Sequence, residues 1–209
     1  MANSMQHWNG NQLCVVDTET TGLDPFWHEV IQLCILPLDS NFEPRQDVIP
    51  FYINLIPDNP ERQSSGAKRK HGIKLTEIMK TGFDRIKAID MLEDWIKTLG
   101  LPVTMYGTPK VILPLGHNYG FDRMMLMGWL GRDYYDTVFH YHYRDTMIMA
   151  NCMNDKAAFH AEKVPFPKTG LQYLCSTLKI DTPHAHDALG DCIATAKVYK
   201  KLMSGGLIT

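Results

Sequence analysis

Residues 13–23 read LCVVDTETTGL, an apolar run that passes directly into a polar segment containing a glycine. Apolar residues with β-branched members, bounded by polar turn formers, are typical of a buried strand followed by a loop. Two acids, Asp17 and Glu19, leave the end of this strand. Because alternate residues of a strand share one face, both carboxylates are expected on the same side of the sheet, where they can share a cation.

Other apolar runs predict the rest of a sheet. A second strand is expected over residues 29–38, pairing antiparallel with the first. A weaker run over 48–56 is interrupted or flanked by prolines, which suits an edge strand. A further buried strand is expected over residues 111–115.

Helices are predicted where apolar residues recur every three or four positions. The predicted helices cover residues 75–80, 86–99, 121–130, 146–153, 171–178 and 187–203. The polar segments 59–72 and 154–168 are expected to be loops, and the signals are weak between 133 and 166. Strands combined with helices in this way indicate an α/β layered domain.

Length and composition favour one compact domain. The chain has 209 residues, of which 44% are hydrophobic, and we expect a single domain over 11–203 with short tails at 1–10 and 204–209. Its five cysteines are dispersed and lack CxxC spacing, which argues against a disulfide framework or a structural zinc site. No stretch approaches the roughly 18 apolar residues of a membrane span. A soluble, cytoplasmic, free-standing protein without a membrane partner is therefore expected.

The net charge of −2 excludes the strongly basic proteins that coat nucleic acid electrostatically. It does not exclude a protein whose carboxylates recruit divalent cations, because the cations supply positive charge where a polyanion would bind. A local basic run, KRKH at residues 68–71, has two interpretations. It is either a solvated surface loop or a loop that contacts phosphate.

Four acids occupy positions where a carboxylate is costly unless it has a function. Asp17 and Glu19 follow a buried strand, Asp122 opens a predicted helix, and Asp191 lies inside a largely apolar helical stretch. Clustered carboxylates offer the all-oxygen ligation that suits Mg²⁺ and Mn²⁺, and two such ions about 3.5–4 Å apart promote in-line displacement at phosphorus. Taken singly, each acid also has an ordinary interpretation as a strand-end, helix-start or exposed helix residue.

His186 precedes Asp191 by five residues, a separation that does not place two side chains on one face of a helix. We therefore expect His186 in the loop or first turn before the helix that carries Asp191. Histidine titrates near neutral pH, so His186 there could act as a general base toward a water molecule that a cation has acidified. The alternative is a capping or core histidine.

Three motifs together resemble those of the DEDDh (DnaQ-like) superfamily of 3'→5' exonucleases. They are VVDTETTGL at 15–23, HNYGFD at 117–122 and HDALGD at 186–191. The superfamily includes the proofreading epsilon subunit of bacterial DNA polymerase III, the oligoribonucleases and the TREX nucleases. The H-x-x-x-x-D spacing of the third motif is typical of its His subclass, and the resemblance spans residues 13 to 199.

The resemblance implies a ribonuclease H-like fold with a mixed, five-stranded sheet and helices on both faces. It implies two Mg²⁺ or Mn²⁺ ions, with Asp17 bridging both. Glu19 and Asp191 would hold the ion nearest the attacking water, and Asp122 would support the second ion through water. His186 would be the general base.

It also implies a substrate and its contacts. The expected partner is a single-stranded DNA or RNA 3' end, from which nucleoside 5'-monophosphates are released. Backbone amides near Thr20 and Thr21 would meet the terminal 3'-hydroxyl, and Leu23 would wedge against the last base. Asn118 and Phe121 would neighbour the scissile nucleotide. Many relatives are homodimers, so a homodimer is an open alternative.

Two other functions compete with this interpretation. One is a non-catalytic nucleic-acid or protein-binding module that retains the fold, and the other is a related phosphodiesterase acting on very short oligonucleotides. The segments 59–71 and 131–168 are where substrate choice would be determined. Within the second, the aromatic and histidine run at 139–143 is either a base-stacking platform for single strands or a packing surface.

Overall fold

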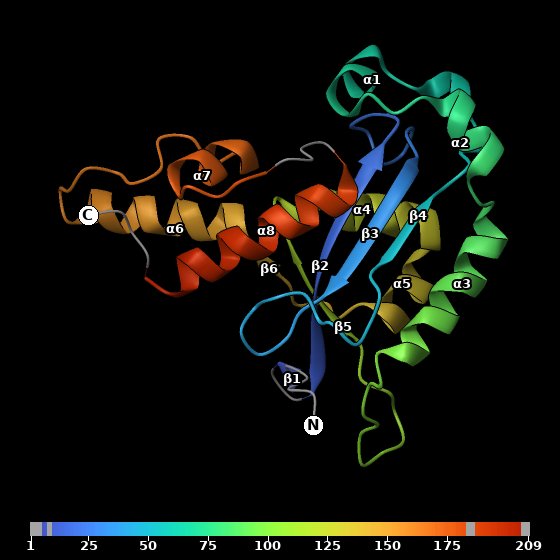
Figure 1. Ribbon diagram of the computed structural model, residues 1–209, viewed down its shortest axis with the longest axis horizontal. Helices are drawn as coiled ribbons and strands as arrows, with labels where there is room; N and C mark the ends of the chain where they lie inside the picture. The colour runs from blue at the N-terminus through green and yellow to red at the C-terminus, as the bar shows by residue number, and fades with distance from the viewer. Residues whose placement is uncertain (1–5, 8–9, 183–186, 206–209) are drawn as a thin grey trace.

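A mixed sheet with strand order β4-β3-β2-β5-β6 forms the centre of the computed structural model, which describes residues 6–7, 10–182 and 187–205 (Figure 1). The long strand β2 (Asn11–Thr20) lies in the middle. It pairs antiparallel with β3 (Val30–Pro37) and parallel with β5 (Ile112–Gly116). Beyond these, β4 (Phe51–Asn54) forms one edge and β6 (Arg144–Asp145) the other.

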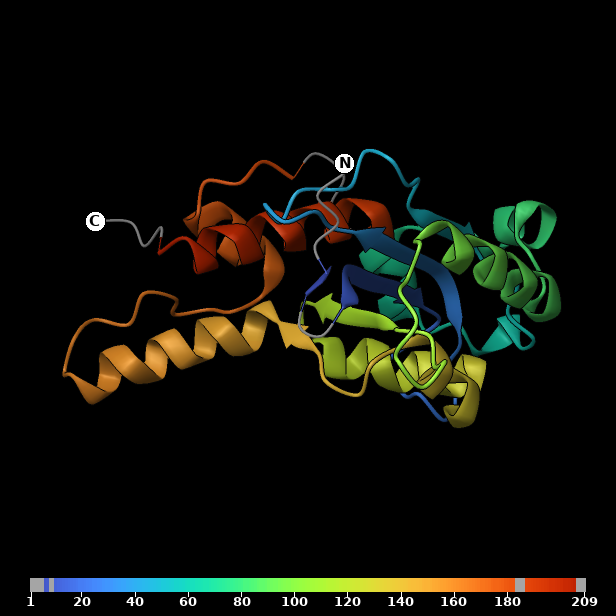
Figure 2. The ribbon, with the colours of Figure 1, turned by 90° about the horizontal axis from the view of Figure 1, so that it is seen from below.

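Helices cover both faces of this sheet and extend beyond it to one side (Figures 1 and 2). Their bounds are α1 (Ser65–His71), α2 (Leu75–Thr81), α3 (Arg85–Thr98), α4 (Tyr119–Leu130), α5 (Arg132–Val138), α6 (Thr146–Phe159), α7 (Leu171–Thr177) and α8 (Ala188–Met203), with a 3₁₀ turn η1 at Pro60–Arg62. The α/β class, the antiparallel pairing of the second strand and the edge position of the third are confirmed. None of the described helices has both the length and the hydropathy needed to cross a bilayer.

The strand β2 separates two hydrophobic cores because its side chains alternate. Cys14 and Val16 pack into a core with α3, α4 and α5 on one face. Leu13 and Val15 pack on the other face against α8, where Cys192 is among their neighbours. Helix α8 also contacts α6 and α7 through a third core, so it lies between the sheet and the lateral helices. The position of α8 relative to β2 is therefore fixed from two sides.

Several boundaries differ from those expected, each for a physical reason. The first strand does not end at Val16 but continues to Thr20, because the polar half still pairs with β3. Residues 59–72 are not a loop, since they form η1 and α1. Ser64 caps α1 by accepting a hydrogen bond from the Ala67 N–H, and Gly72 ends the helix with φ of 68°. Helix α1 buries no residue, so it has no apolar periodicity to detect.

Four elements lie wholly or partly where the sequence signals were weak or absent. Helix α6 continues past residue 153 to Phe159, and α5 and β6 occupy the stretch before it. The two-residue strand β1 (Gln6–His7) pairs with the start of β2, in a segment expected to be a tail. The cysteines are free thiols, and four of the five are buried.

The turn from β5 into α4 leaves no room for a side chain at Gly116. A Cβ there would lie 2.8 Å from the Cβ of Tyr119, which is fully buried and whose hydroxyl is hydrogen-bonded to that of Tyr135 at 2.8 Å. We therefore expect Gly116→Ala to lower the free energy of unfolding by about 1–3 kcal/mol, as overpacking does. Urea denaturation would measure this change.

Gly120→Ala is the matched control, because a Cβ at this helical position meets no atom within 4 Å. Alanine is the better helix former, so the control should be neutral or stabilising by up to about 1 kcal/mol. Equal midpoints for Gly116→Ala and the wild type would contradict the close packing described here.

Candidate active site

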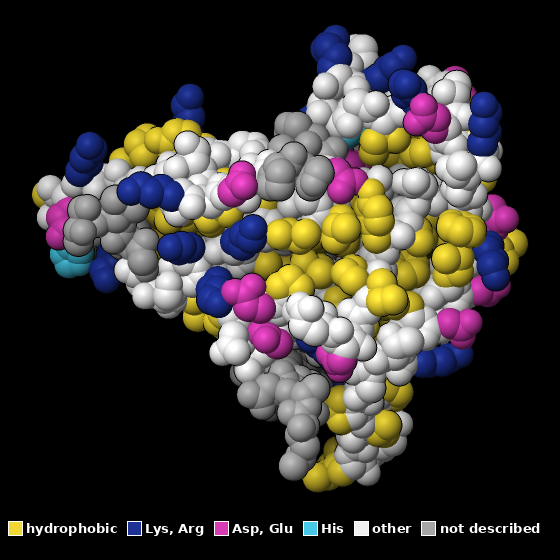
Figure 3. Space-filling view, viewed as in Figure 1, with side chains coloured by type: hydrophobic (Ala, Val, Ile, Leu, Met, Phe, Trp, Pro, Cys, Tyr) yellow, Lys and Arg dark blue, Asp and Glu magenta, His cyan; other side chains and the backbone are white. Residues whose placement is uncertain are grey.

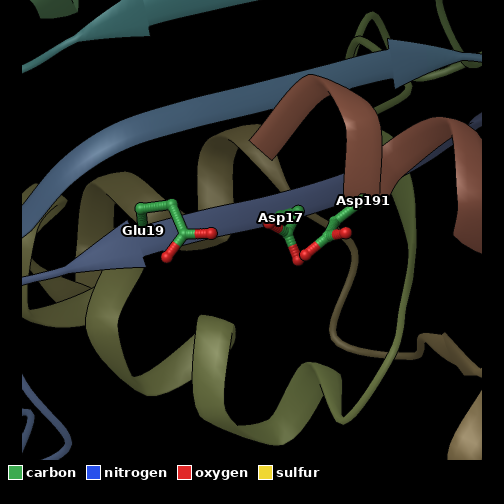
Figure 4. A group of neighbouring side chains, drawn as sticks. All are labelled: Asp17, Glu19 and Asp191. Carbon is green, nitrogen blue, oxygen red and sulfur yellow. The ribbon is translucent and has the colours of Figure 1, made fainter. Parts of the chain in front are cut away.

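Three carboxylates from two elements meet at the end of the central strand. Each of Asp17, Glu19 and Asp191 offers an oxygen, and these oxygens lie within 4.8 Å of one another. Figure 4 shows Asp17 and Asp191 facing each other, with Glu19 farther along the same strand. The sequence predicted that acids far apart in the chain would cluster, and Asp17, Glu19 and Asp191 do so.

The alternation of β2 explains why these acids meet. Leu13 and Val15 face α8 and belong to the core beneath it, and Asp17 and Glu19 continue the same face. Asp191 lies in the first turn of α8. The face of β2 that is apolar beneath the body of the helix thus becomes acidic beside its first turn.

Asp122 lines the same cleft but is held apart from the group of three. It lies in the first turn of α4 and is 4% exposed. Its Oδ1 accepts hydrogen bonds from the backbone N–H of Thr18 at 3.0 Å and from the Thr18 hydroxyl at 2.6 Å. Thr18 lies between Asp17 and Glu19 in the first motif. The sequence did not indicate that Thr18 orients Asp122.

Burial and mutual repulsion make these carboxylates hard to ionise. Burial, followed by the charges of Asp122 and Glu19, raises the pKa of Asp17 well above its usual range. Burial raises the pKa of Glu19 to about 8 against the opposing charge of Lys70. Burial raises the pKa of Asp122 to about 7 although the Thr18 hydrogen bonds oppose it. A cation would relieve these penalties, and the all-oxygen donor set suits Mg²⁺ or Mn²⁺.

The acids line a cleft of about 430 Å³, and the basic side chain of Lys70 also lines it. The lining residues other than the acids lie in β2, α1, α4, α6 and α7 or directly before α4 and α7: Thr18, Lys70, His117, Asn118, Phe121, Met147, Gly170, Leu171, Gln172 and Tyr173. Figure 3 shows Lys and Arg side chains gathered over α1, whose last turn carries the basic run Lys68 to His71. Because Lys70 reaches the cleft, the phosphate-contacting interpretation of that run is favoured over a purely solvated one.

Two of the five residues expected to touch substrate line this cleft, whereas Thr20, Thr21 and Leu23 do not. The Leu23 side chain is 80% exposed and therefore accessible from solvent. Asn118 and Phe121 line the cleft. The Thr20 hydroxyl donates to the Gly22 carbonyl at 2.7 Å. The backbone N–H of Thr21, however, already donates to the Glu29 carbonyl at 2.8 Å.

His186 lies outside the described residues, but the helix start that follows it is firmly anchored. The Tyr52 hydroxyl donates to the Asp187 carboxylate, which also caps α8. Gln32 accepts from the Ala188 N–H at 2.9 Å and donates to Tyr52 at 3.0 Å. The only sequence signal for this network was a glutamine inside an otherwise apolar strand.

The aromatic and histidine run lies at the other end of the sheet. The His140 N–H donates to the carbonyl of Ile112 at 2.7 Å, where β5 begins, whereas His117 follows the end of that strand. The rings of His140 and Tyr141 stack on each other at 4.6 Å. This position favours a packing surface over a stacking platform for a strand bound at the acids.

The raised pKa values predict how stability depends on pH and metal. In the unfolded chain these acids ionise near pH 4, whereas the folded, metal-free protein keeps Glu19 and Asp122 protonated up to about pH 8 and 7. The native state then binds more protons, so its stability should fall as pH rises from about 4 to 8. Calorimetry should show Tm decreasing from pH 5 to 8 in EDTA.

Added Mn²⁺ should raise Tm more at pH 8 than at pH 5. Asp17→Asn should flatten the pH dependence and remove most of the metal effect, whereas Asp155→Asn, an exposed change on α6, should do neither. A metal-free Tm that does not vary with pH, together with no response to Mn²⁺ at pH 8, would contradict a cation site here.

The comparisons with known proteins find similarity in structure only. No family model and no curated protein matches the sequence. Among solved structures, E. coli exonuclease I in complex with a dA16 oligonucleotide matches with a TM-score of 0.68 and 22% identity, over 94% of this chain and 42% of that one. Exonuclease I from Methylocaldum szegediense matches with a TM-score of 0.69 and 21% identity, over 93% and 40%.

A third similar structure is that of cell-death related nuclease 4, CRN-4, with a TM-score of 0.68 and 18% identity over 94% of this chain and 64% of that one. The chain spans only about two fifths of the length of the exonuclease I chains. At these identities the likeness concerns architecture. The ribonuclease H-like α/β fold that the three motifs implied is confirmed, and it is the fold of the exonuclease I and CRN-4 nucleases.

Proposed function

We propose that this chain is a metal-dependent 3'→5' exonuclease that releases nucleoside 5'-monophosphates from single-stranded DNA or RNA ends. The observation that carries the proposal is the convergence of the Asp17, Glu19 and Asp191 oxygens within 4.8 Å. They converge at the end of the central strand of a fold that exonuclease I shares. Solved structures of E. coli exonuclease I contain dT13 and dA16 oligonucleotides, which supports a single-stranded substrate.

Two Mg²⁺ or Mn²⁺ ions would supply positive charge to the scissile phosphate and lower the pKa of the attacking water. Asp17 would contact both ions, because it lies between Glu19 and Asp191 in the cluster. Glu19 and Asp191 would complete the ligands of one ion. Asp122 would act on the second through water, since its Oδ1 already accepts two hydrogen bonds from Thr18.

The chain's own residues would orient the phosphate and move the proton. Lys70 would pair with a phosphate oxygen, because it lines the cleft from α1. His186 would accept the proton of the attacking water. Its support is its spacing to Asp191 in the sequence and the fixed start of α8 directly after it.

The terminal nucleotide would lie between Leu23 and the first turn of α4. Leu23 is exposed enough to stack against a base, and Phe121 and Asn118 line the cleft that holds the acids. The amides of Thr20 and Thr21 would meet the 3'-hydroxyl, with the Thr21 N–H exchanging its bond to Glu29 for one to the substrate. In this proposal residues 11–203 form the exonuclease domain.

Asp17→Ala should abolish hydrolysis, because it removes the ligand shared by both ions. The assay is a time course on 5'-labelled single-stranded DNA and RNA with EDTA, Mg²⁺ or Mn²⁺. We expect a metal-dependent ladder shortening from the 3' end for the wild type and for Asp155→Asn. An Asp17→Ala enzyme that retained appreciable activity would rule out the two-ion assignment, and an inactive wild type that still bound oligonucleotide would favour a binding module.

His186→Ala should slow turnover by roughly 10²- to 10⁴-fold, the usual contribution of a general base, while Mn²⁺ still raises Tm as in the wild type. His184→Ala is the matched control, since His184 lacks the spacing to Asp191. A near-wild-type rate for His186→Ala, or an equal loss in both variants, would remove His186 from the mechanism.

A further inference from the structure

A second pocket lies between the loop that follows β2 and helix α4, both of which line it. Its volume is about 240 Å³, and aromatic and basic side chains contribute to its wall. Phe26 and Trp27 come from the loop, Arg62 from η1, Arg85 from the start of α3 and Trp129 from α4. None of these residues belongs to the three motifs or to the cleft that holds the acids.

Two segments connect this pocket to the acids. The loop that carries Phe26 and Trp27 follows β2, the strand of Asp17 and Glu19. Helix α4 carries Asp122 in its first turn and Trp129 seven residues later. At 1.5 Å per residue this separation is about 10 Å along the helix axis. Stacked nucleotides of one strand are about 3.4 Å apart, and extended ones are farther apart, so the pocket lies about two or three nucleotides from the acids.

The chemistry of the pocket suits an unpaired nucleotide. The guanidinium of Arg62 lies 4.1 Å from the centre of the Trp27 ring, an arrangement that combines a cation with an aromatic face. Trp27 is 53% exposed and Phe26 is 95% exposed, so both rings are accessible to a base. Proteins that bind single strands combine such stacking rings with positive charge along the backbone.

Two acids, Glu29 and the exposed Asp58, also line the pocket, together with the two arginines Arg62 and Arg85. The Glu29 carboxylate accepts hydrogen bonds from the backbone N–H groups of Asp58 and Asn59 at 2.6 and 2.9 Å, and from the Asn59 side chain at 2.9 Å. Its negative charge is therefore directed at donors within the protein. Arg62 and Arg85 remain to contact phosphate.

The loop that presents the two rings is already ordered for binding. Asp24 accepts hydrogen bonds from the Phe26 N–H through its carboxylate, and from the His28 N–H through its carbonyl. The Asp24 N–H in turn donates to the His28 ring at 3.0 Å. The loop also packs closely on α4, because a Cβ on Gly128 would lie 3.3 Å from the Pro25 carbonyl. A preformed platform loses less entropy when a base stacks on it.

We propose that this pocket, formed by Phe26, Trp27, Arg62, Arg85 and Trp129, is a subsite for an unpaired nucleotide upstream of the scissile bond. This inference rests on the proposed function and narrows its substrate. A dinucleotide occupies only the cleft at the acids, whereas a longer single strand reaches both sites. The enzyme then prefers longer single strands to the very short oligonucleotides that a related phosphodiesterase would favour.

The test measures affinity as a function of chain length. Fluorescence anisotropy with labelled dT2 and dT8 in Ca²⁺ gives both affinities, and a gel checks that the oligonucleotides stay intact. Trp27→Ala should weaken dT8 binding roughly 5- to 150-fold, the effect of losing one stacked base, and leave dT2 unchanged. Phe26→Ala should also weaken dT8 selectively, and its 95% exposure means that a folding defect cannot explain the loss.

Arg62→Gln should weaken dT8 and reduce the salt dependence of its binding, because one phosphate contact is lost. Tyr106→Ala is the matched control, since that ring is 87% exposed but does not line the pocket. Unchanged dT8 affinity in both the Trp27 and Phe26 variants, or an equal loss on dT2 and dT8, would overturn the subsite.

These outcomes separate the subsite from the proposed function. Length-dependent binding that both ring variants lose, in a protein that hydrolyses neither oligonucleotide, would keep the subsite and reject the exonuclease. Hydrolysis that proceeds equally well on dT2 and dT8, with KM values that the Trp27 and Phe26 variants leave unchanged, would keep the exonuclease and reject the subsite.

Discussion

Repulsion between buried carboxylates is the constraint on which the rest of this structure depends. Like charges at such short distances destabilise a protein unless protons or cations neutralise them. The acids stay together because each belongs to an element held by an apolar core. Strand β2 is packed on both faces, and α8 is packed between the sheet and the lateral helices. Hydrophobic burial elsewhere thus offsets the electrostatic cost of the site.

The start of α8 is positioned by hydrogen bonds from the sheet. Asp191 must approach Asp17, so the first turn of the helix has to be fixed in both position and orientation. Gln32 and Tyr52, from β3 and β4, do this through hydrogen bonds to the residues before Asp191. Such a polar network, in which Gln32 is buried, is favourable only when its members are satisfied, and Gln32 both donates and accepts. The edge of the sheet therefore contributes to the site without touching it.

The core of the fold and the acids could be predicted from the sequence, because strand alternation and helical periodicity report elements that have an apolar face. Helix α1 could not, since it buries no side chain and depends on its caps and on the chain around it. For the same reason, the sequence did not show that Lys70 lines the cleft, because that position depends on the tertiary structure. Thr18 and Gln32 carried weak signals, a polar residue within a strand, but their partners lie 104 and 156 residues away in the chain.

The alternation of side chains along β2 has an evolutionary consequence. Residues 13 and 15 are hydrophobic anchors, and residues 17 and 19 are acids on the same face, so the strand links packing and chemistry through one register. Losing or gaining a single residue between them would turn the acids toward the opposite face of the sheet. Divergent descendants of this chain should therefore tolerate length changes in the exposed turn at 104–108. They should retain the same number of residues along β2.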